Sequence, residues 1–272
     1  MFALQNKSLD TQYRLPLQQL LSWSEAEDFS VLSSVKFSQT SLNFRRYGVE
    51  ISTLGLFSLS PRFQDLLQQL SFPVAAYELL SLYLLELGVL GLGAASGSTK
   101  TAYRLYLGLN SRQSSKGVAI EWIPETDRFV VRYYSKIEPC VVKVIQGLAT
   151  EASNGCQWGE LHQQILVKTL VNLWYQGGKT WDLFQVTEDG NPRCSVDLGL
   201  YDTGICFLDI QSDLVALREL FSISKVLYDS WFDTAKHQIL NRAAMGTDRK
   251  GNAFLTLYTL SMPLPNLVTW HG

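Results

Sequence analysis

Eight stretches of the sequence alternate apolar and polar residues with a period of two, and this pattern constrains the fold more than any other feature. A period of two places successive side chains on opposite faces of a β-strand. The predicted strands are 30–37, 41–52, 101–110, 117–123, 128–134, 180–186, 193–202 and 253–260. Polar turns separate several of them, at 124–127, 188–192 and 248–252. Short turns of this kind join antiparallel strands. The last turn, which carries Arg249 and Lys250, is expected to be a solvated hairpin.

Helical periodicity occurs between these strands and predicts an outer helical layer. The predicted helices are 14–27, 61–71, 74–89, 137–150, 158–176 and 211–230. Helices and hairpins recur without the strict alternation of a parallel sheet. No linker rich in proline, serine or charge divides the chain, so we expect a single domain over residues 1–272. An antiparallel sheet covered by helices is the predicted α+β architecture, and closing it into a barrel would remove its edges.

Composition narrows the function classes. The chain is 46% hydrophobic and 18% charged, and its net charge of −2 gives no reason to expect nucleic acid or a membrane surface. The most apolar segment, 73–95, contains Glu78 and Glu86 and is therefore predicted to be a buried helix rather than a membrane span. The first residues lack the pattern of a signal peptide, so a cytoplasmic protein is expected. Four cysteines without CxxC spacing and three histidines predict no fixed metal site.

One segment superficially resembles a phosphate-binding loop. In residues 93–101 the glycines are too closely spaced, and Lys100 does not follow the second glycine directly. A strand is predicted after it, where a true phosphate loop would be followed by a helix. We therefore do not assign a phosphate loop here.

A cation followed two residues later by a tyrosine recurs on separate strands. Arg104 and Tyr106 share one face of their strand, and Arg132 and Tyr134 share one face of theirs. A longer set shares a face on a third strand, namely Arg193, Ser195, Asp197, Gly199 and Tyr201. Two interpretations are open: the solvated face of an open sheet, or the interior of a closed barrel. In a barrel, buried cations would need an anion, and a diphosphate suits the geometry of arginine. Tyrosine faces beside it would stabilise a carbocation and exclude water.

The order of elements, the Arg-x-Tyr strands and the segment "GTDRKGNAFLTLYTL" (246–260) resemble the cyanobactin peptide prenyltransferases. The resemblance extends over about residues 28–260. It implies the ABBA prenyltransferase barrel, in which ten antiparallel strands enclose the active site and helices lie outside.

The resemblance also implies site residues. The diphosphate-binding set is Arg46 (with Arg45 as the alternative), Arg104 and Arg193, with Lys100 and Arg132 as additional members. The tyrosines that would shield a carbocation are Tyr106, Tyr134, Tyr201 and Tyr258.

The sequence departs from the family pattern at two places. Leu32 stands where members that alkylate tyrosine oxygen carry a glutamate, so the general base must be sought elsewhere. Its candidates are Glu121, Asp197, His237 and Asp182. Members limited to a five-carbon donor carry a bulky Phe before the last hairpin, where this chain has Ala243 and Ala244. The resemblance thus implies geranyl diphosphate as the donor, with dimethylallyl diphosphate second.

The leading hypothesis is prenyl transfer to a side chain of a ribosomally made cyclic or linear peptide, with His, Trp or Arg favoured as the acceptor. Two alternatives are a prenyltransferase of a small indole or phenol, and a non-catalytic relative that binds isoprenoid or peptide. No fixed cofactor is expected, although Mg²⁺ would be able to assist by neutralising the diphosphate. A monomer or weak dimer without a nucleic-acid or membrane partner is expected.

Overall fold

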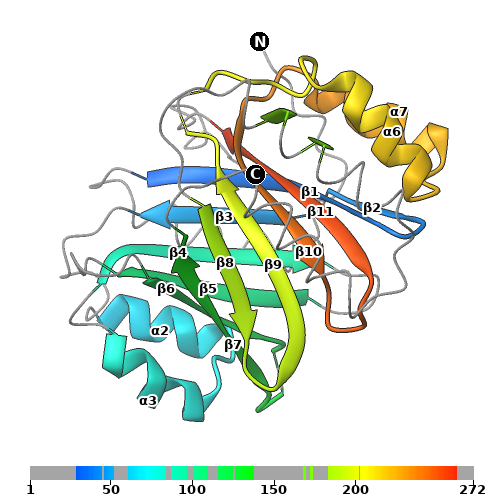
Figure 1. Ribbon diagram of the computed structural model, residues 1–272. Helices are drawn as coiled ribbons and strands as arrows, with labels where there is room; N and C mark the ends of the chain where they lie inside the picture. Colours follow the sequence, from blue (N-terminus) through cyan, green and yellow to red (C-terminus); the bar gives the residue numbers. More distant parts are fainter. Residues whose placement is uncertain are drawn as a thin grey trace.

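Each barrel strand pairs with the next along the chain, and the last strand pairs with the first (Figure 1). The computed structural model describes residues 29–44, 46–51, 61–83, 87–96, 101–109, 116–124, 126–137, 168–169, 172–173, 183–201 and 203–261. Within these residues ten strands form the closed barrel: β1 (Phe29–Ser38), β3 (Arg46–Ile51), β4 (Leu87–Ser96), β5 (Thr101–Leu109), β6 (Lys116–Trp122), β7 (Phe129–Lys136), β8 (Leu183–Glu188), β9 (Asn191–Gly199), β10 (Leu240–Thr247) and β11 (Ala253–Ser261). All pairs are antiparallel, which confirms the predicted ten-stranded barrel.

Barrel closure depends on the pairing of β1 with β11. Their register runs over eight residue pairs, from Val31 opposite Ser261 to Ser38 opposite Phe254. The other side of β1 is shared by two strands. Its first half pairs with β3, and its last residues pair with the short strand β2 (Ser41–Asn43). Strand β1 is therefore paired on both sides, with β3 and β2 on one side and β11 on the other, and the barrel has no open edge there.

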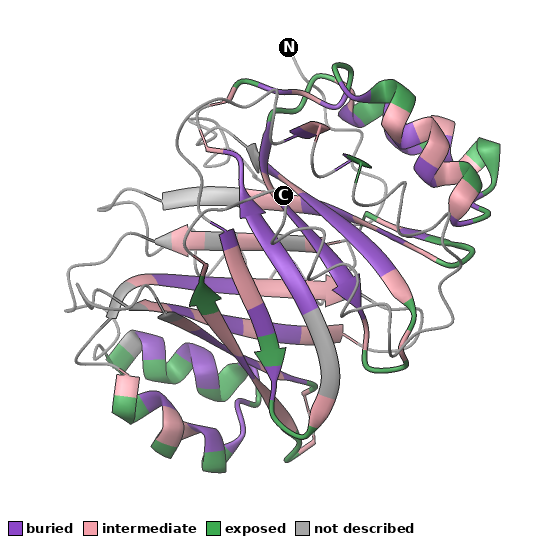
Figure 2. Ribbon diagram, in the orientation of Figure 1, coloured by how far each residue is buried: buried purple, intermediate pink, exposed green. Residues whose placement is uncertain are grey.

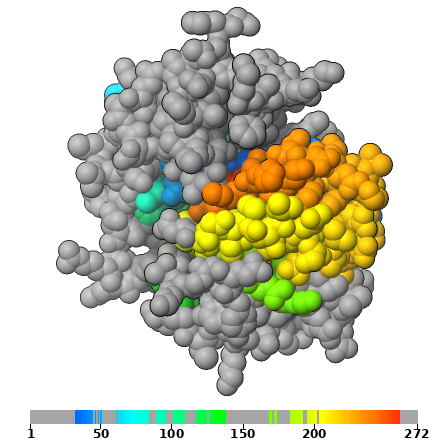
Figure 3. Space-filling view, turned by 90° about the horizontal axis from the view of Figure 1, so that it is seen from above, coloured from blue at the N-terminus to red at the C-terminus, as the bar shows by residue number. Residues whose placement is uncertain are grey.

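Helices cover the outside of the barrel in two groups. The first group is α2 (Pro61–Gln69) and α3 (Val74–Tyr83), which pack on β4, β5 and β6 around buried residues such as Leu66 and Leu105. The second is α6 (Gln211–Leu220) and α7 (Lys225–Ala235), which pack over the opposite part of the sheet around Phe37 and Trp231. Seen from above, the described residues of this second group, yellow to orange, gather on one side of the molecule (Figure 3).

The period of two in each strand separates the helix-packed face from the lumen. On β5, Tyr103, Leu105 and Leu107 are buried in the core beneath α2 and α3. Arg104 and Tyr106 alternate with them and line the interior. Burial drawn on the ribbon shows that β9, β10 and β11 are buried along most of their described length, so both of their faces lie inside the protein (Figure 2). The interior interpretation of the Arg-x-Tyr pattern is therefore the one that the fold supports.

Two strands were not predicted. The helix expected over 74–89 ends at Tyr83, and β4 begins at Leu87. Strand β4 is rich in glycine and alanine, which have low strand propensity. Strand β10 carries two alanines and a glycine, and its sequence did not predict a strand for the same reason. The helix expected over 211–230 is two helices, and Ser224 caps the second by accepting a hydrogen bond from the Leu227 N–H at 3.3 Å.

The helices expected at 14–27 and 137–150 lie outside the described residues, as does most of 158–176. In the part of the chain that the structure describes, no helix is both long and apolar enough to cross a membrane.

The outer face of β5 packs against the helices, so its contribution to stability can be tested directly. Leu105→Ala removes a fully buried side chain and should lower the free energy of unfolding by about 2–5 kcal/mol. Leu82→Ala, on the exposed side of α3, is the matched control and should change it by less than about 0.5 kcal/mol. Urea denaturation measures both, and equal effects would contradict the assignment of the two faces.

Candidate active site

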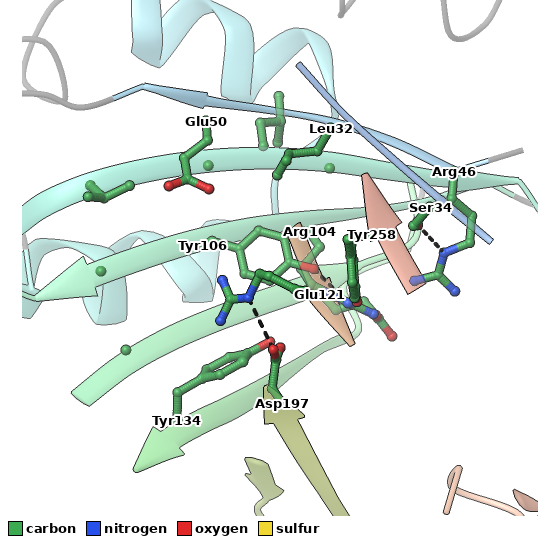
Figure 4. A pocket seen from close by; sticks show the side chains of 18 of the residues that line it. Leu32, Ser34, Arg46, Glu50, Arg104, Tyr106, Glu121, Tyr134, Asp197 and Tyr258 are labelled. Carbon is green, nitrogen blue, oxygen red and sulfur yellow. Dashed lines mark hydrogen bonds and ion pairs between the residues drawn. The ribbon is translucent and has the colours of Figure 1, made fainter. Parts of the chain in front are cut away.

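The barrel encloses a cavity of about 420 Å³ to which all ten barrel strands contribute lining residues (Figure 4). Its polar and aromatic residues include Arg46, Glu50, Arg104, Tyr106, Glu121, Tyr134, Asp197, Tyr201, Arg242 and Tyr258. Residues far apart in the sequence meet here because the lumen-facing side of every strand points to one axis. The volume lies in the range of pockets that bind small molecules.

Glu121 stands at the centre of an arginine cluster. It lies directly opposite Arg104 across β5 and β6. Its Oε2 accepts hydrogen bonds from Arg104 Nε at 2.9 Å and lies 2.8 Å from Arg132 Nη2, while Oε1 lies 3.1 Å from Arg249 Nη2. Burial alone would raise the pKa of Glu121, but the arginines beside it hold that pKa well below its ordinary value. A carboxylate held ionised by three arginines is a weak proton acceptor, so this arrangement does not favour the predicted role of Glu121 as the catalytic base.

A second carboxylate extends this cluster. Glu188 is buried, with its Oε2 at 3.3 Å from Arg132 Nε and its Oε1 at 2.6 Å from Arg249 Nε. Arg249 belongs to the turn between β10 and β11, which was expected to be only a solvated hairpin. It instead bridges Glu121 and Glu188, and so ties that turn to β6 and β8. Arg132 is buried within this network rather than lining the cavity.

Arg46 differs from the other cavity arginines. Its Nε donates a hydrogen bond to Ser34 Oγ at 3.2 Å, and no carboxylate of the described residues forms an ion pair with it. Burial lowers the pKa of Arg46; Tyr258 opposes this, and the charge of Arg104 adds to it. The charge of Glu121 reaches Arg46 only at longer range. A partly desolvated guanidinium without a directly paired carboxylate is costly, and an anion entering the cavity would relieve that cost.

Tyrosine side chains lie around Arg46 and Arg104 in the cavity. Arg104 Nη1 donates to the Tyr106 hydroxyl at 2.8 Å, and its guanidinium lies 5.6 Å from the centre of the same ring. Tyr106 and Tyr134 have ring centres 6.3 Å apart. Burial raises the pKa of Tyr134 and of Tyr258, so both phenols stay neutral. Neutral hydroxyls can donate hydrogen bonds to an anion, and the ring faces can stabilise a cation.

Arg242 was missed because β10 was not predicted. The period of β10 places Arg242 and Ala244 on one face, and that pattern was the available signal. Arg242 Nε lies 3.0 Å from Asp197 Oδ1, and its guanidinium lies 5.9 Å from the Phe184 ring centre and 6.0 Å from that of Tyr201. Burial works to lower the pKa of Arg242, but Asp197 raises it well above the ordinary value. Asp197 therefore lies in the cavity as predicted, but with its carboxylate occupied by an arginine.

Several predicted residues lie elsewhere. His237 is exposed in the turn after α7 and is not among the residues that line the cavity, so its predicted catalytic role gains no support from the site. Ala243 packs in the core under α6 and α7, where it pairs with the core residues Leu198 and Leu257, and it does not line the cavity as the predicted prenyl pocket would require. Ala244 is on the lumen face, opposite Asp197, but is not among the residues that line the cavity. The predicted residues outside the described part of the chain are Arg45, Lys100, Asp182 and the side chain of Arg193.

Part of the cavity wall is bare backbone. Glycines face the lumen on four adjacent strands, namely Gly48, Gly91, Gly93, Gly108 and Gly117. A Cβ at Gly91 would lie 3.3 Å from Tyr106 Cβ, and one at Gly117 would lie 3.5 Å from Tyr134 Cβ. Because these two glycines have no side chain, Tyr106 and Tyr134 can lie close to the neighbouring strand backbone, and the cavity beyond their rings stays open.

The described residues contain no group of three His, Cys, Asp or Glu side chains placed to hold a metal ion. The carboxylates of Glu121 and Asp197 are bound to arginines, so they do not offer the oxygen-ligand set that Mg²⁺ requires.

Comparison of the fold identifies relatives that the sequence does not. No protein-family profile matches the chain, and no curated protein sequence matches it. The structure is similar to AnaPT from Neosartorya fischeri, with a TM-score of 0.55 and 11% identity over 85% of this chain and 77% of AnaPT. It is similar to the NotF prenyltransferase, with a TM-score of 0.55 and 13% identity over 85% of this chain and 80% of NotF. It also matches NotF in complex with brevianamide F and DMSPP, at a TM-score of 0.55 and 12% identity.

These similarities establish the fold class: the chain has the ABBA prenyltransferase barrel. At 11–13% identity they do not establish the narrower peptide-modifying family.

The ion pairs of Glu121 predict how stability depends on pH. Because its folded-state pKa lies below the ordinary value of 4.5, its contribution to stability is present above pH 4.5 and is lost as the pH falls through the folded-state pKa. Glu121→Gln should therefore be less stable than wild type at pH 7, and this difference should shrink as the pH falls below 4.5. Urea denaturation from pH 7 down to pH 3 would measure it.

The matched control for this series is Glu78→Gln, an exposed carboxylate on α3. It should leave stability close to wild type at every pH. A Glu121→Gln difference that stayed constant with pH would contradict the ionised cluster.

Proposed function

We propose that this chain is a prenyltransferase, which moves a prenyl group from its diphosphate to an acceptor inside the barrel. The observation that carries the proposal is Arg46, a half-buried cation facing the cavity without a carboxylate partner among the described residues. The tyrosines that line the same cavity offer ring faces that would stabilise an allylic cation. The likeness to the NotF prenyltransferase in fold supports the same reaction class.

Arg46 and Arg104 are proposed to bind the diphosphate. Arg46 offers a guanidinium whose only described side-chain partner is Ser34. Arg104 shares its charge with Glu121, but it faces the same cavity and donates to Tyr106. As the C1–O bond of the donor breaks, negative charge builds on the leaving diphosphate. Preorganised guanidiniums stabilise that charge more in the transition state than in the ground state.

The tyrosines are proposed to protect the prenyl cation. Tyr106, Tyr134 and Tyr258 line the cavity, and their ring faces favour a positive charge. They also occupy positions that water would otherwise take, which limits hydrolysis of the cation. Tyr201 lies farther along the wall, beside Arg242.

Two acceptor classes remain proposals. A side chain of a ribosomally made cyclic or linear peptide, with His, Trp or Arg favoured, is supported by the sequence resemblance. A small indole is supported by a different observation, the structure of NotF in complex with brevianamide F and DMSPP. In both cases the acceptor group must enter a cavity of about 420 Å³ together with the donor.

The function is tested by incubating the protein with geranyl or dimethylallyl diphosphate and a panel of acceptors, followed by mass spectrometry. The panel holds cyclic peptides containing His, Trp, Arg or Tyr, together with brevianamide F. A prenyl-sized mass gain on one acceptor is expected. Absence of any gain while the donor still binds would favour a non-catalytic relative that only binds isoprenoid.

Arg46→Met should raise the donor KM, or the Kd of a thiolo-diphosphate analogue, by about tenfold or more, because a charge-assisted contact is lost. Arg128→Met, in the exposed turn between β6 and β7, is the matched control and should leave both constants unchanged. Equal donor binding by Arg46→Met and wild type would place the diphosphate elsewhere.

Donor length is proposed to depend on Ala244. Geranyl diphosphate is the favoured donor and dimethylallyl diphosphate the second, on the argument that a small residue on the lumen face leaves room for another isoprene unit. Ala244→Leu should lower the geranyl rate relative to the dimethylallyl rate by about tenfold, on the scale at which added volume in a packed site is felt. Competition between the two donors, read by mass spectrometry, measures the ratio.

Ala243→Leu adds the same volume on the core side of the same strand. It should lower stability by about 1–3 kcal/mol without changing the donor ratio. An unchanged ratio in Ala244→Leu would contradict the role of Ala244.

A further inference from the structure

Glu121 contacts its arginines unequally through its two carboxylate oxygens. An arginine and a carboxylate commonly pair in bidentate fashion, with two N–H groups on two oxygens. Here Nε and Nη2 of Arg104 both contact the same oxygen, Oε2, the first at 2.9 Å. The other oxygen, Oε1, lies 3.1 Å from Nη2 of Arg249. Arg104 is therefore paired with one oxygen of Glu121, while Arg249 holds the second.

Arg132 competes with Arg104 for the oxygen that remains. Its Nη2 lies 2.8 Å from Oε2 of Glu121, so two guanidiniums share that oxygen. Glu188 holds both competing arginines, with Arg132 Nε at 3.3 Å and Arg249 Nε at 2.6 Å. The cluster thus sets three positive charges against two negative charges, which leaves one positive charge unmatched within it.

The cluster divides into side chains that face the cavity and side chains that support them. Arg104 and Glu121 line the cavity, whereas Arg132, Glu188 and Arg249 are not among its lining residues. Nη1 of Arg104 donates to the hydroxyl of Tyr106, another residue of the cavity wall. A short-range effect of Arg249 on a ligand in the cavity would therefore pass through Glu121.

The turn that carries Arg249 is held by its own hydrogen bonds. Oδ1 of Asp248 accepts from the backbone N–H groups of Lys250 at 2.8 Å and Asn252 at 2.9 Å. The N–H of Gly251 donates to the carbonyl of Asp248 at 3.0 Å, with a φ of 78° that suits glycine. The turn therefore presents Arg249 to β6 and β8 from a defined position.

Resting on the proposed function, we propose that Arg249 is a positioning residue for the donor diphosphate. By holding Oε1 of Glu121, it prevents a bidentate ion pair between Glu121 and Arg104. The guanidinium of Arg104 then keeps charge for the diphosphate, which competes with Glu121 for it. Without Arg249, Glu121 turns both oxygens to Arg104 and withdraws it from the donor. The turn between β10 and β11 thereby sets donor affinity from outside the cavity.

The test measures the Kd of a thiolo-diphosphate analogue of the donor and, separately, the Kd of inorganic diphosphate. Arg249→Met should raise both by about fivefold, the scale of coupling between groups in one ion-pair network. Arg249→Lys keeps a cation and should recover part of the loss. Lys250→Met removes the same charge from the exposed next position of the turn and should leave both constants unchanged. In turnover, Arg249→Met should raise the donor KM and leave the acceptor KM unchanged.

A double-mutant cycle tests whether Arg249 acts through Glu121. Glu121→Gln removes the competing charge and should tighten binding of the analogue by about fivefold at pH 7. In that background, Arg249→Met should change the Kd by about twofold or less. Circular dichroism checks that each variant is folded. If Glu121→Gln does not fold, the comparison of Arg249→Met with Arg249→Lys and Lys250→Met still decides the proposal.

Unchanged affinity for both probes in Arg249→Met would overturn the inference, provided that wild type binds them. A fivefold loss that persists in the Glu121→Gln background would overturn it as well. The proposed function fails on a different observation, namely a wild-type protein that binds neither probe, and the inference then falls with it.

Discussion

Neutralisation of buried arginines is the constraint on which the rest of the barrel interior depends. A guanidinium inside a protein is tolerated only beside a counter-charge, and the lumen provides carboxylates in matching positions. Glu121 and Glu188 serve Arg104, Arg132 and Arg249, and Asp197 serves Arg242. Arg46 is left with a hydroxyl partner alone among the described residues. The proposed function follows from the lack of a carboxylate partner at Arg46, because a bound diphosphate would supply the negative charge.

The same ion pairs connect chemistry to architecture. Glu121 joins strands β5, β6 and β7 with the β10–β11 turn, through arginines that each belong to a different element. Closure of β11 onto β1 then places Tyr258 directly opposite Ser34, beside Arg46. The cationic end of the cavity is therefore assembled from both ends of the described chain. Glu50 stands at the other end, where bare glycine backbone widens the wall.

Much of the barrel could be predicted because a period of two is a local signal. Strand β5 shows this well: its period of two separated an apolar face from the face of Arg104 and Tyr106, although the sequence left open whether the latter faced solvent or a barrel interior. Strand β4 could not be found in the same way, because its lumen positions are glycines selected for space rather than for strand propensity. The small residues of β10 concealed Arg242 for the same reason.

Roles within the site were harder to predict than positions. Glu121 has the residue type of a general base, and only the three arginines around it reveal that it is held ionised. Ala243 and Ala244 are neighbours in sequence, yet strand alternation sends one to the core and the other to the lumen.

The most direct test of the central claim is a crystal structure of the protein with a thiolo-diphosphate analogue of the prenyl donor. We expect the diphosphate oxygens within hydrogen-bond distance of the Arg46 and Arg104 guanidiniums, with the prenyl group extending along β3 toward Glu50. A diphosphate bound outside the barrel, or inside it without contact to Arg46, would contradict the account.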